Sequence, residues 1–171
     1  MSRIVEFLKL VENAPLASGH TRSIRHTSPE GGLDTIGYGH KLTPTEVYNN
    51  AVGEYCLSQL DEEVATLILI QDIQKYSNSL TRRLKKRMGV SYGKLPIRSQ
   101  DMLLDFEFNL GDALRKFPMF TKAVVEGDEA VYSREYQRSY ADSEGVRHPL
   151  ARNRLFHEWF LSEEAKDYYG G

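Results

Sequence analysis

The stretch GGLDTIGYGHKLT, residues 31–43, constrains the fold more than any other part of the sequence. Its polar and apolar residues alternate between glycines, a pattern typical of a short strand in a hairpin. The four residues Thr43 to Glu46 then combine an N-cap threonine, a proline at the first helical position and a glutamate at the third, which predicts a helix start. The chain is therefore expected to leave a small hairpin and enter a helical region at residue 43.

One helix is predicted before the hairpin. Ile4, Leu8 and Val11 recur at the spacing of one helical face, so residues 2–13 should form an amphipathic helix. Pro15 disfavours helical geometry at the residue before it, and we expect this helix to end near Asn13. The segments TRSIRHTS and DTIGYGHKL then read as strands, with the turn SPEGG, residues 28–32, between them.

After the hairpin the sequence reads mostly as helix. Asp61 is placed to cap a segment, Val64 to Ile73, that is apolar nearly all round and is therefore predicted to be a buried central helix. Ser99 is predicted to cap another helix that ends at Gly111, and two or three helices should follow Phe120. Helices and strands are thus segregated along the chain, which predicts an α+β fold.

Composition excludes several classes of protein. The 171 residues fit one domain, and a net charge of −2 argues against nucleic-acid binding. The single cysteine, Cys56, excludes an internal disulfide, and no apolar run approaches the roughly 20 residues of a membrane span. The charged N-terminal helix lacks a signal-peptide core. We expect no cofactor and no metal, because His20 and His26 have no convincing further ligands.

Glu12 falls at the C-terminal end of the first predicted helix. Exposed carbonyl groups and the negative end of the helix dipole disfavour ionisation of a carboxyl group there. A carboxylic acid that keeps its proton near neutral pH is what a general acid requires. On position alone, a solvated surface glutamate is the alternative interpretation.

A glutamate that closes the first helix, then a hairpin, then TIGYGH before a helical region resembles the phage lysozyme family, of the type found in T-even phages. Later segments are also similar to the family, so the likeness covers most of the chain: ILIQDI at 68–73, FNLG at 108–111, MFTKAV at 119–124 and RHPLARNR at 147–154. The resemblance implies a lysozyme-like fold, in which a long central helix joins a small hairpin lobe to a larger helical lobe. We expect a single domain, residues 1–171, with a hairpin lobe of about 14–60 and a helical lobe of about 61–171 packed with helix 2–13.

The resemblance implies a peptidoglycan muramidase, which hydrolyses the β-1,4 bond between N-acetylmuramic acid and N-acetylglucosamine during phage-induced host lysis. It further implies a monomer whose partner is bacterial peptidoglycan, with no nucleic acid and no membrane insertion. Such a protein would be made in the host cytoplasm without a signal peptide. It would reach the cell wall through a phage holin or as part of a virion.

By the same resemblance, Glu12 would protonate the glycosidic oxygen and Thr35 would hold a water molecule or the hairpin acid. The loop around Tyr38 would lie close to the sugar, and Asn109 would hydrogen-bond to substrate. His40 would form a structural pair with Asp72. The site residues that the resemblance implies are therefore Glu12, Thr35, Tyr38, His40, Asp72 and Asn109.

The position of the second carboxylate departs from the family, because Thr35 follows Glu12 by 23 positions and the loop is longer. Glu30, in the turn, is the preferred candidate. Asp34 alternates with Thr35, so it should face away if Thr35 faces the cleft. If neither acts, a lytic transglycosylase or a substrate-assisted path becomes credible, and a non-catalytic glycan-binding module is the alternative from another class.

Overall fold

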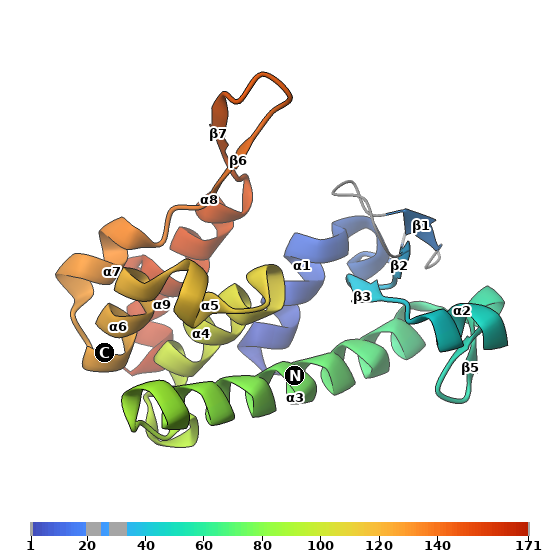
Figure 1. Ribbon diagram of the computed structural model, residues 1–171, viewed down its shortest axis with the longest axis horizontal. Helices are drawn as coiled ribbons and strands as arrows, with labels where there is room; N and C mark the ends of the chain where they lie inside the picture. The colour runs from blue at the N-terminus through green and yellow to red at the C-terminus, as the bar shows by residue number, and fades with distance from the viewer. Residues whose placement is uncertain (1, 20–24, 28–33, 171) are drawn as a thin grey trace. The chain divides into compact units, whose positions relative to one another are not determined.

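The computed structural model describes residues 2–19, 25–27 and 34–170 (Figure 1). The chain divides into two compact units, residues 1–75 and 76–171. The long helix α3, Glu62–Met88, begins in the first unit and ends in the second. The sequence assigned helix 2–13 to the same lobe as the later helices, whereas in the structure this helix belongs to the first unit.

The first unit consists of one kinked helix, a small sheet, a short helix with a second strand pair, and the first half of α3. Its sheet is antiparallel in the order β1-β2-β3, with Thr35 opposite His26 on one side and Lys41 on the other. Strands occur at both predicted places, but DTIGYGHKL is not one strand: the chain turns at Gly37–Gly39, so this segment forms β2 and returns as β3. The turn SPEGG lies outside the described residues. The elements before α3 are α1 Arg3–Ala17, β1 His26–Thr27, β2 Asp34–Ile36, β3 His40–Lys41, α2 Pro44–Asn49, β4 Ala51–Val52, β5 Tyr55–Cys56 and η1 Leu57–Gln59.

The predicted capping box at the start of α2 is confirmed. The Thr43 hydroxyl accepts a hydrogen bond from the Glu46 amide at 3.3 Å, and the Glu46 carboxylate accepts one from the Thr43 amide at 2.7 Å. The sheet, the segment that follows it and α3 together contribute to a buried apolar cluster. The cluster consists of Ile36, Leu42, Val52, Leu57, Leu60 and Ile68.

Helix α1 is interrupted where the sequence predicted its end. Asn13 has φ −158° and ψ 75°, so the regular helix stops after Glu12, and a further turn runs from Ala14 to Ala17. The further turn accommodates Pro15 near its start, where a missing amide donor costs little. Glu12 is therefore the last residue of the first helical segment.

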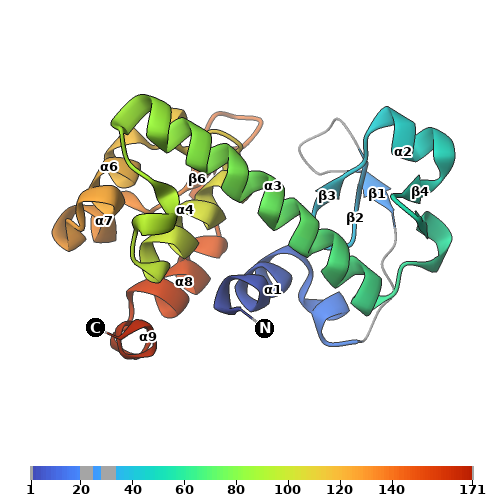
Figure 2. The ribbon, with the colours of Figure 1, turned by 90° about the horizontal axis from the view of Figure 1, so that it is seen from below.

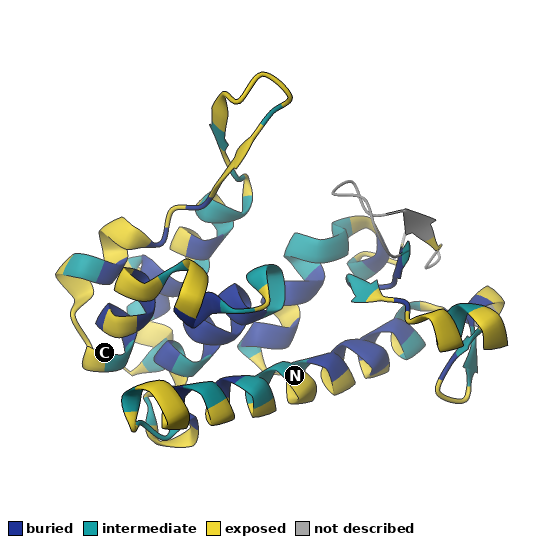
Figure 3. Ribbon diagram, viewed as in Figure 1, coloured by how far each residue is buried: buried dark blue, intermediate teal, exposed yellow. Residues whose placement is uncertain are grey.

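Helix α3 begins as predicted, because the Asp61 carboxylate accepts a hydrogen bond from the Val64 amide at 3.0 Å. The prediction that it is buried nearly all round is wrong. Ile68 is buried, but Leu67 is 42% exposed and Ile70 is 43% exposed. Exposed and buried residues alternate along the helix (Figure 3). Apolar composition indicates that a helix has faces to bury, but not how many of them its neighbours cover.

The second unit is a group of helices with one two-stranded hairpin, β6–β7, that projects from them (Figure 1). Helix α4 ends at Gly111 as predicted, with φ +84° at that glycine. Ser99 is not its N-cap, because the helix begins two residues earlier, after Pro96. After α3 the elements are η2 Tyr92–Lys94, α4 Ile97–Leu110, α5 Ala113–Lys116, α6 Pro118–Glu126, α7 Glu129–Glu135, β6 Ser139–Ala141, β7 Arg147–Pro149, α8 Arg152–Phe156, η3 His157–Leu161 and α9 Glu163–Tyr169.

A buried acid lies at the centre of this second unit. Asp105 is 0% exposed and forms ion pairs with Arg138 at 2.8 Å and with Arg152. Arg138 is itself 2% exposed, and its guanidinium lies 4.2 Å from the centre of the Phe106 ring. The two cations compensate the charge that burial would otherwise make costly.

We predict that Asp105→Asn lowers the free energy of unfolding by about 3–5 kcal/mol, because it leaves buried Arg138 without its counter-ion. The matched control is Glu158→Gln, which breaks an exposed pair with Arg154 at 2.8 Å. That change should cost no more than about 0.5 kcal/mol. Urea unfolding of the two variants measures both values. Equal losses would contradict a special contribution from the buried pair.

Candidate active site

The Glu12 side chain lies against the loop Gly37–Gly39 in the middle of the TIGYGH motif. A Cβ atom built on Gly39 would lie 2.9 Å from Glu12 Oε2 and 3.4 Å from its Cδ. Gly39 also has φ +80°, a conformation that residues with a side chain rarely adopt. The backbone at position 39 thus favours glycine, and a side chain there would displace the Glu12 carboxylate from its position.

A polar cluster around Glu62 holds Tyr38, the residue before Gly39 in this loop. Glu62 Oε1 accepts hydrogen bonds from the Tyr38 hydroxyl and the Thr66 hydroxyl, both at 3.0 Å, and Lys9 Nζ lies 2.5 Å from the same oxygen. These residues come from α1, the loop and α3, and α1 lies beside the start of α3 (Figure 2). The hydrogen bond from Lys9 is the main cause that lowers the pKa of Glu62.

Tyr38, which the resemblance assigned to substrate, is 2% exposed. Burial, together with the hydrogen bond to Glu62, raises the pKa of its phenol. Its ring and hydroxyl are therefore occupied by protein contacts in this structure. The pairing of Lys9 with Glu62 was not predicted from the sequence, because no local pattern links residues that lie more than fifty positions apart.

The structure brings His40 and Asp72 together, as the resemblance implied. His40 Nδ1 lies 2.8 Å from Asp72 Oδ2, and His40 Nε2 lies 3.3 Å from Glu46 Oε1. Burial alone would lower the pKa of His40, but the hydrogen bonds and charges of the two carboxylates outweigh it and raise that pKa. Glu46 therefore serves both the capping box and the histidine.

Two of the hairpin candidates, Asp34 and Thr35, lie on β2. Thr35 is 7% exposed in the middle strand of the sheet. The Asp34 carboxylate forms an ion pair with the Arg25 guanidinium. Glu30 lies outside the described residues, so its role stays a prediction.

Asn109 belongs to the second unit, near the end of α4. Its side-chain oxygen accepts a hydrogen bond from Arg138 at 3.3 Å. The buried Arg138–Asp105 pair thus orients the amide of Asn109. Its contact with substrate stays a prediction.

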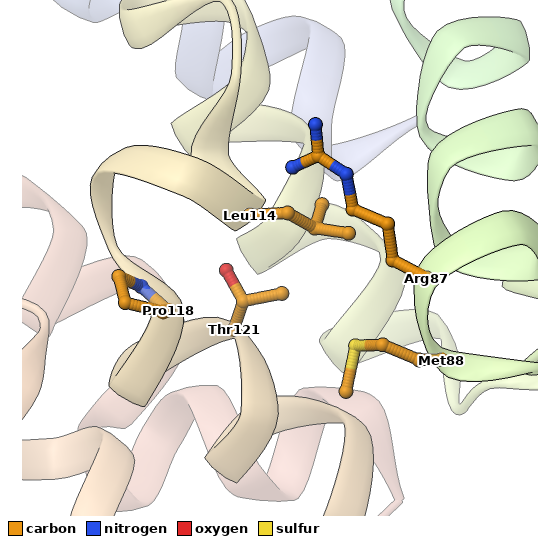
Figure 4. Close-up of a pocket in the computed structure, with 5 residues that line it drawn as sticks. All are labelled: Arg87, Met88, Leu114, Pro118 and Thr121. Carbon is orange, nitrogen blue, oxygen red and sulfur yellow. The ribbon is translucent and has the colours of Figure 1, made fainter.

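A small pocket lies in the second unit between the end of α3 and helices α5 and α6 (Figure 4). Its volume is about 200 Å³, below the range of about 300–1,000 Å³ that is common for ligand sites. Arg87 is the one ionisable group among its lining residues, and it is paired with Asp112 at 3.2 Å. The pocket has no carboxylic acid, so we place the candidate site at Glu12. The lining residues are Arg87, Met88, Leu114, Pro118 and Thr121.

Within the described ranges, no group of three or more histidine, cysteine, aspartate or glutamate side chains is arranged to hold a metal ion. Among the same residues, no helix combines the length and the apolar character that crossing a membrane requires.

We predict that Asp72→Asn destabilises the protein more in mild acid than in base. A histidine with a raised folded pKa contributes its full stability below its ordinary pKa of 6.5 and loses that contribution as the pH rises through the folded pKa. Urea unfolding at about pH 5.5 and about pH 9 should therefore show the larger loss at the lower pH. The same loss at both values would indicate packing rather than charge.

No family model matches the sequence, and no curated protein aligns with it significantly. Among solved structures, the chain is similar to the muramidase domain of SpmX from Asticaccaulis excentricus. The TM-score is 0.63 and the sequence identity is 21%, over 95% of this chain and 97% of that chain. At this identity the similarity is informative about the fold. It confirms the prediction: the chain has a lysozyme-like α+β fold.

Proposed function

We propose that this protein is a muramidase, a glycoside hydrolase that cleaves the β-1,4 bond between N-acetylmuramic acid and N-acetylglucosamine in bacterial peptidoglycan. The observation that carries the proposal is the position of Glu12. It ends the first helical segment, and its carboxylate lies against Gly39 of the TIGYGH motif. A lysozyme-like fold, and a structural neighbour described as a muramidase domain, support the same activity.

In the proposed reaction, Glu12 donates its proton to the glycosidic oxygen as the bond from the anomeric carbon to that oxygen breaks. Positive charge develops on the ring of N-acetylmuramic acid, and a water molecule then adds to the anomeric carbon and gives a proton to a carboxylate of the site. The reaction therefore requires an acid held at a fixed place. The close approach to Gly39 and the partial burial of Glu12 hold its carboxyl group in place.

The second carboxylate in this proposal is Glu30, and Thr35 holds the water or that acid. Asp34 is the weaker candidate, because the guanidinium of Arg25 already compensates its charge. A compensated carboxylate offers less negative potential to an oxocarbenium-like transition state. If neither acid acts, a lytic transglycosylase is the second candidate. It would cleave the same bond by intramolecular attack of the substrate's 6-hydroxyl group, leaving a 1,6-anhydro end.

Purified sacculi distinguish these activities. Mass spectrometry of the soluble products should show reducing N-acetylmuramic acid ends, whereas 1,6-anhydro ends would favour the transglycosylase. Binding to sacculi without release of fragments would favour a non-catalytic module.

From the sequence resemblance we further propose a role in phage-induced host lysis. Rapid loss of turbidity of outer-membrane-permeabilised Gram-negative cells would be consistent with that role.

We expect Glu12→Gln to lower the rate of muropeptide release by about 10²–10⁴-fold, because the amide keeps the size of the side chain but supplies no suitable proton. Glu6→Gln changes an exposed glutamate of the same helix and serves as the control with unchanged activity. Circular dichroism checks that both variants fold. Retention of a third of wild-type activity in Glu12→Gln would rule out this assignment.

Gly39→Ala should separate the position of Glu12 from stability. The positive φ should cost alanine about 1–2 kcal/mol, and Gly145→Ala carries the same cost, because Gly145 also has φ +80° but no atom within 4 Å of its added Cβ. The flexible Glu12 side chain can move away, so we expect similar losses of stability in the two variants. Activity should fall by about 10²-fold in Gly39→Ala alone. Equal activity in both would mean that the Glu12 contact is unimportant for turnover.

Glu30→Gln should lower kcat severely with little change in substrate affinity, since the loss lies in the transition state. Asp34→Asn should matter much less. The kinetics on soluble glycan fragments measure both effects. The reverse ranking would transfer the role to Asp34, and near-full activity in both variants would favour the transglycosylase.

A further inference from the structure

The break in α1 directly after Glu12 is tied to the loop Gly37–Gly39 by one side chain. Asn13 Oδ1 accepts a hydrogen bond from the Leu16 amide at 3.2 Å, which caps the turn that follows the break. Asn13 Nδ2 donates to the Gly37 carbonyl, also at 3.2 Å, across 24 positions of the sequence. One amide group therefore both begins the second helical turn and holds the loop.

A second hydrogen bond, from Tyr38 within the loop, also holds the loop in place. The phenol donates to Glu62, which Lys9 and Thr66 also contact. The backbone of the loop is thus fixed at Gly37 by Asn13 and at the next residue by the Glu62 cluster. Gly39, which contacts the Glu12 carboxylate, follows directly after these two anchors.

Capping alone does not account for asparagine at position 13. Serine, threonine and aspartate all cap helices, because a cap needs only an acceptor. Among the preferred capping residues, asparagine alone adds an NH₂ donor on the same rigid planar group. That donor is the group bound to Gly37.

We infer that Asn13 is a positioning residue for Glu12: it ends the helix at the acid and fixes the loop whose backbone the Glu12 carboxylate contacts. The inference rests on the proposed role of Glu12 as general acid. Displacement of a reacting group by about 1 Å costs about 10²-fold in rate. Loss of the tie between Asn13 and Gly37 should therefore appear in kcat rather than in substrate binding.

Two variants separate positioning from capping. Asn13→Ser and Asn13→Asp both keep an acceptor for the Leu16 amide. Serine is too short to reach the Gly37 carbonyl, and the ionised aspartate has no donor. We expect kcat to fall by about 10–100-fold in both, with KM within about twofold and thermal stability close to wild type. Ser18→Ala is the control, because it removes an exposed hydrogen bond to Ala14 from the same turn without touching the loop.

Full kcat in both variants would show that Asn13 is only a cap and would overturn the inference. A fall in Asn13→Asp alone would also overturn it, because the added charge beside Glu12 would then be the cause. A second readout does not depend on turnover. The carboxyl carbon resonance of Glu12 and the amide resonance of Gly39 should move in Asn13→Ser but not in Ser18→Ala.

This second readout keeps the inference separate from the proposed function. If the wild-type protein releases no fragments from sacculi, the proposed activity fails, but the two resonances still report whether Asn13 sets the environment of Glu12. Unchanged resonances in Asn13→Ser would overturn the inference, whether or not the protein is active.

Discussion

The contact between the Glu12 carboxylate and Gly39 is the constraint on which the arrangement of the first unit depends. It favours glycine at position 39, with a backbone conformation that other residues rarely adopt. It also requires the loop to remain in place relative to α1, although two of the three loop residues are glycines without side chains. Two hydrogen bonds meet this requirement: Asn13 donates to the Gly37 carbonyl of the loop, and Tyr38 of the loop donates to Glu62. These polar contacts act together with the buried Tyr38 ring to hold the loop.

A second set of polar contacts fixes the far end of the same motif. His40 lies between Asp72 of α3 and Glu46 of α2. Because the other oxygen of Glu46 also caps its own helix through Thr43, one carboxylate couples the start of α2 to the histidine. The apolar cluster around Ile36 supplies burial beneath these contacts. Burial stabilises the unit, whereas the hydrogen bonds determine the register of the loop.

Most features of the fold that depend on local rules were predictable from the sequence, although the cap predicted at Ser99 was wrong, and those that depend on distant partners were not. The capping box at Thr43, the cap at Asp61 and the glycine that ends α4 follow from short-range hydrogen bonding, and the structure has all three. The β6–β7 hairpin was missed, because its strands have three residues each and show no clear alternation. The one available signal was Asp142, whose carboxylate accepts hydrogen bonds from the amides of Glu144 and Val146 in the turn. In the candidate site, Glu12 was found through the family resemblance, whereas the role of Asn13 depends on a partner 24 positions away.

The departures from local rules gather at Glu12 itself. A lysine three residues before Glu12 is almost fully buried. The adjoining loop contains two glycines with positive φ, and the tyrosine between them uses its hydroxyl to bind Glu62. Together with the break at Asn13 they bring one half-buried carboxylate to one place on the backbone, and a fixed position is what the proposed role of Glu12 as general acid requires.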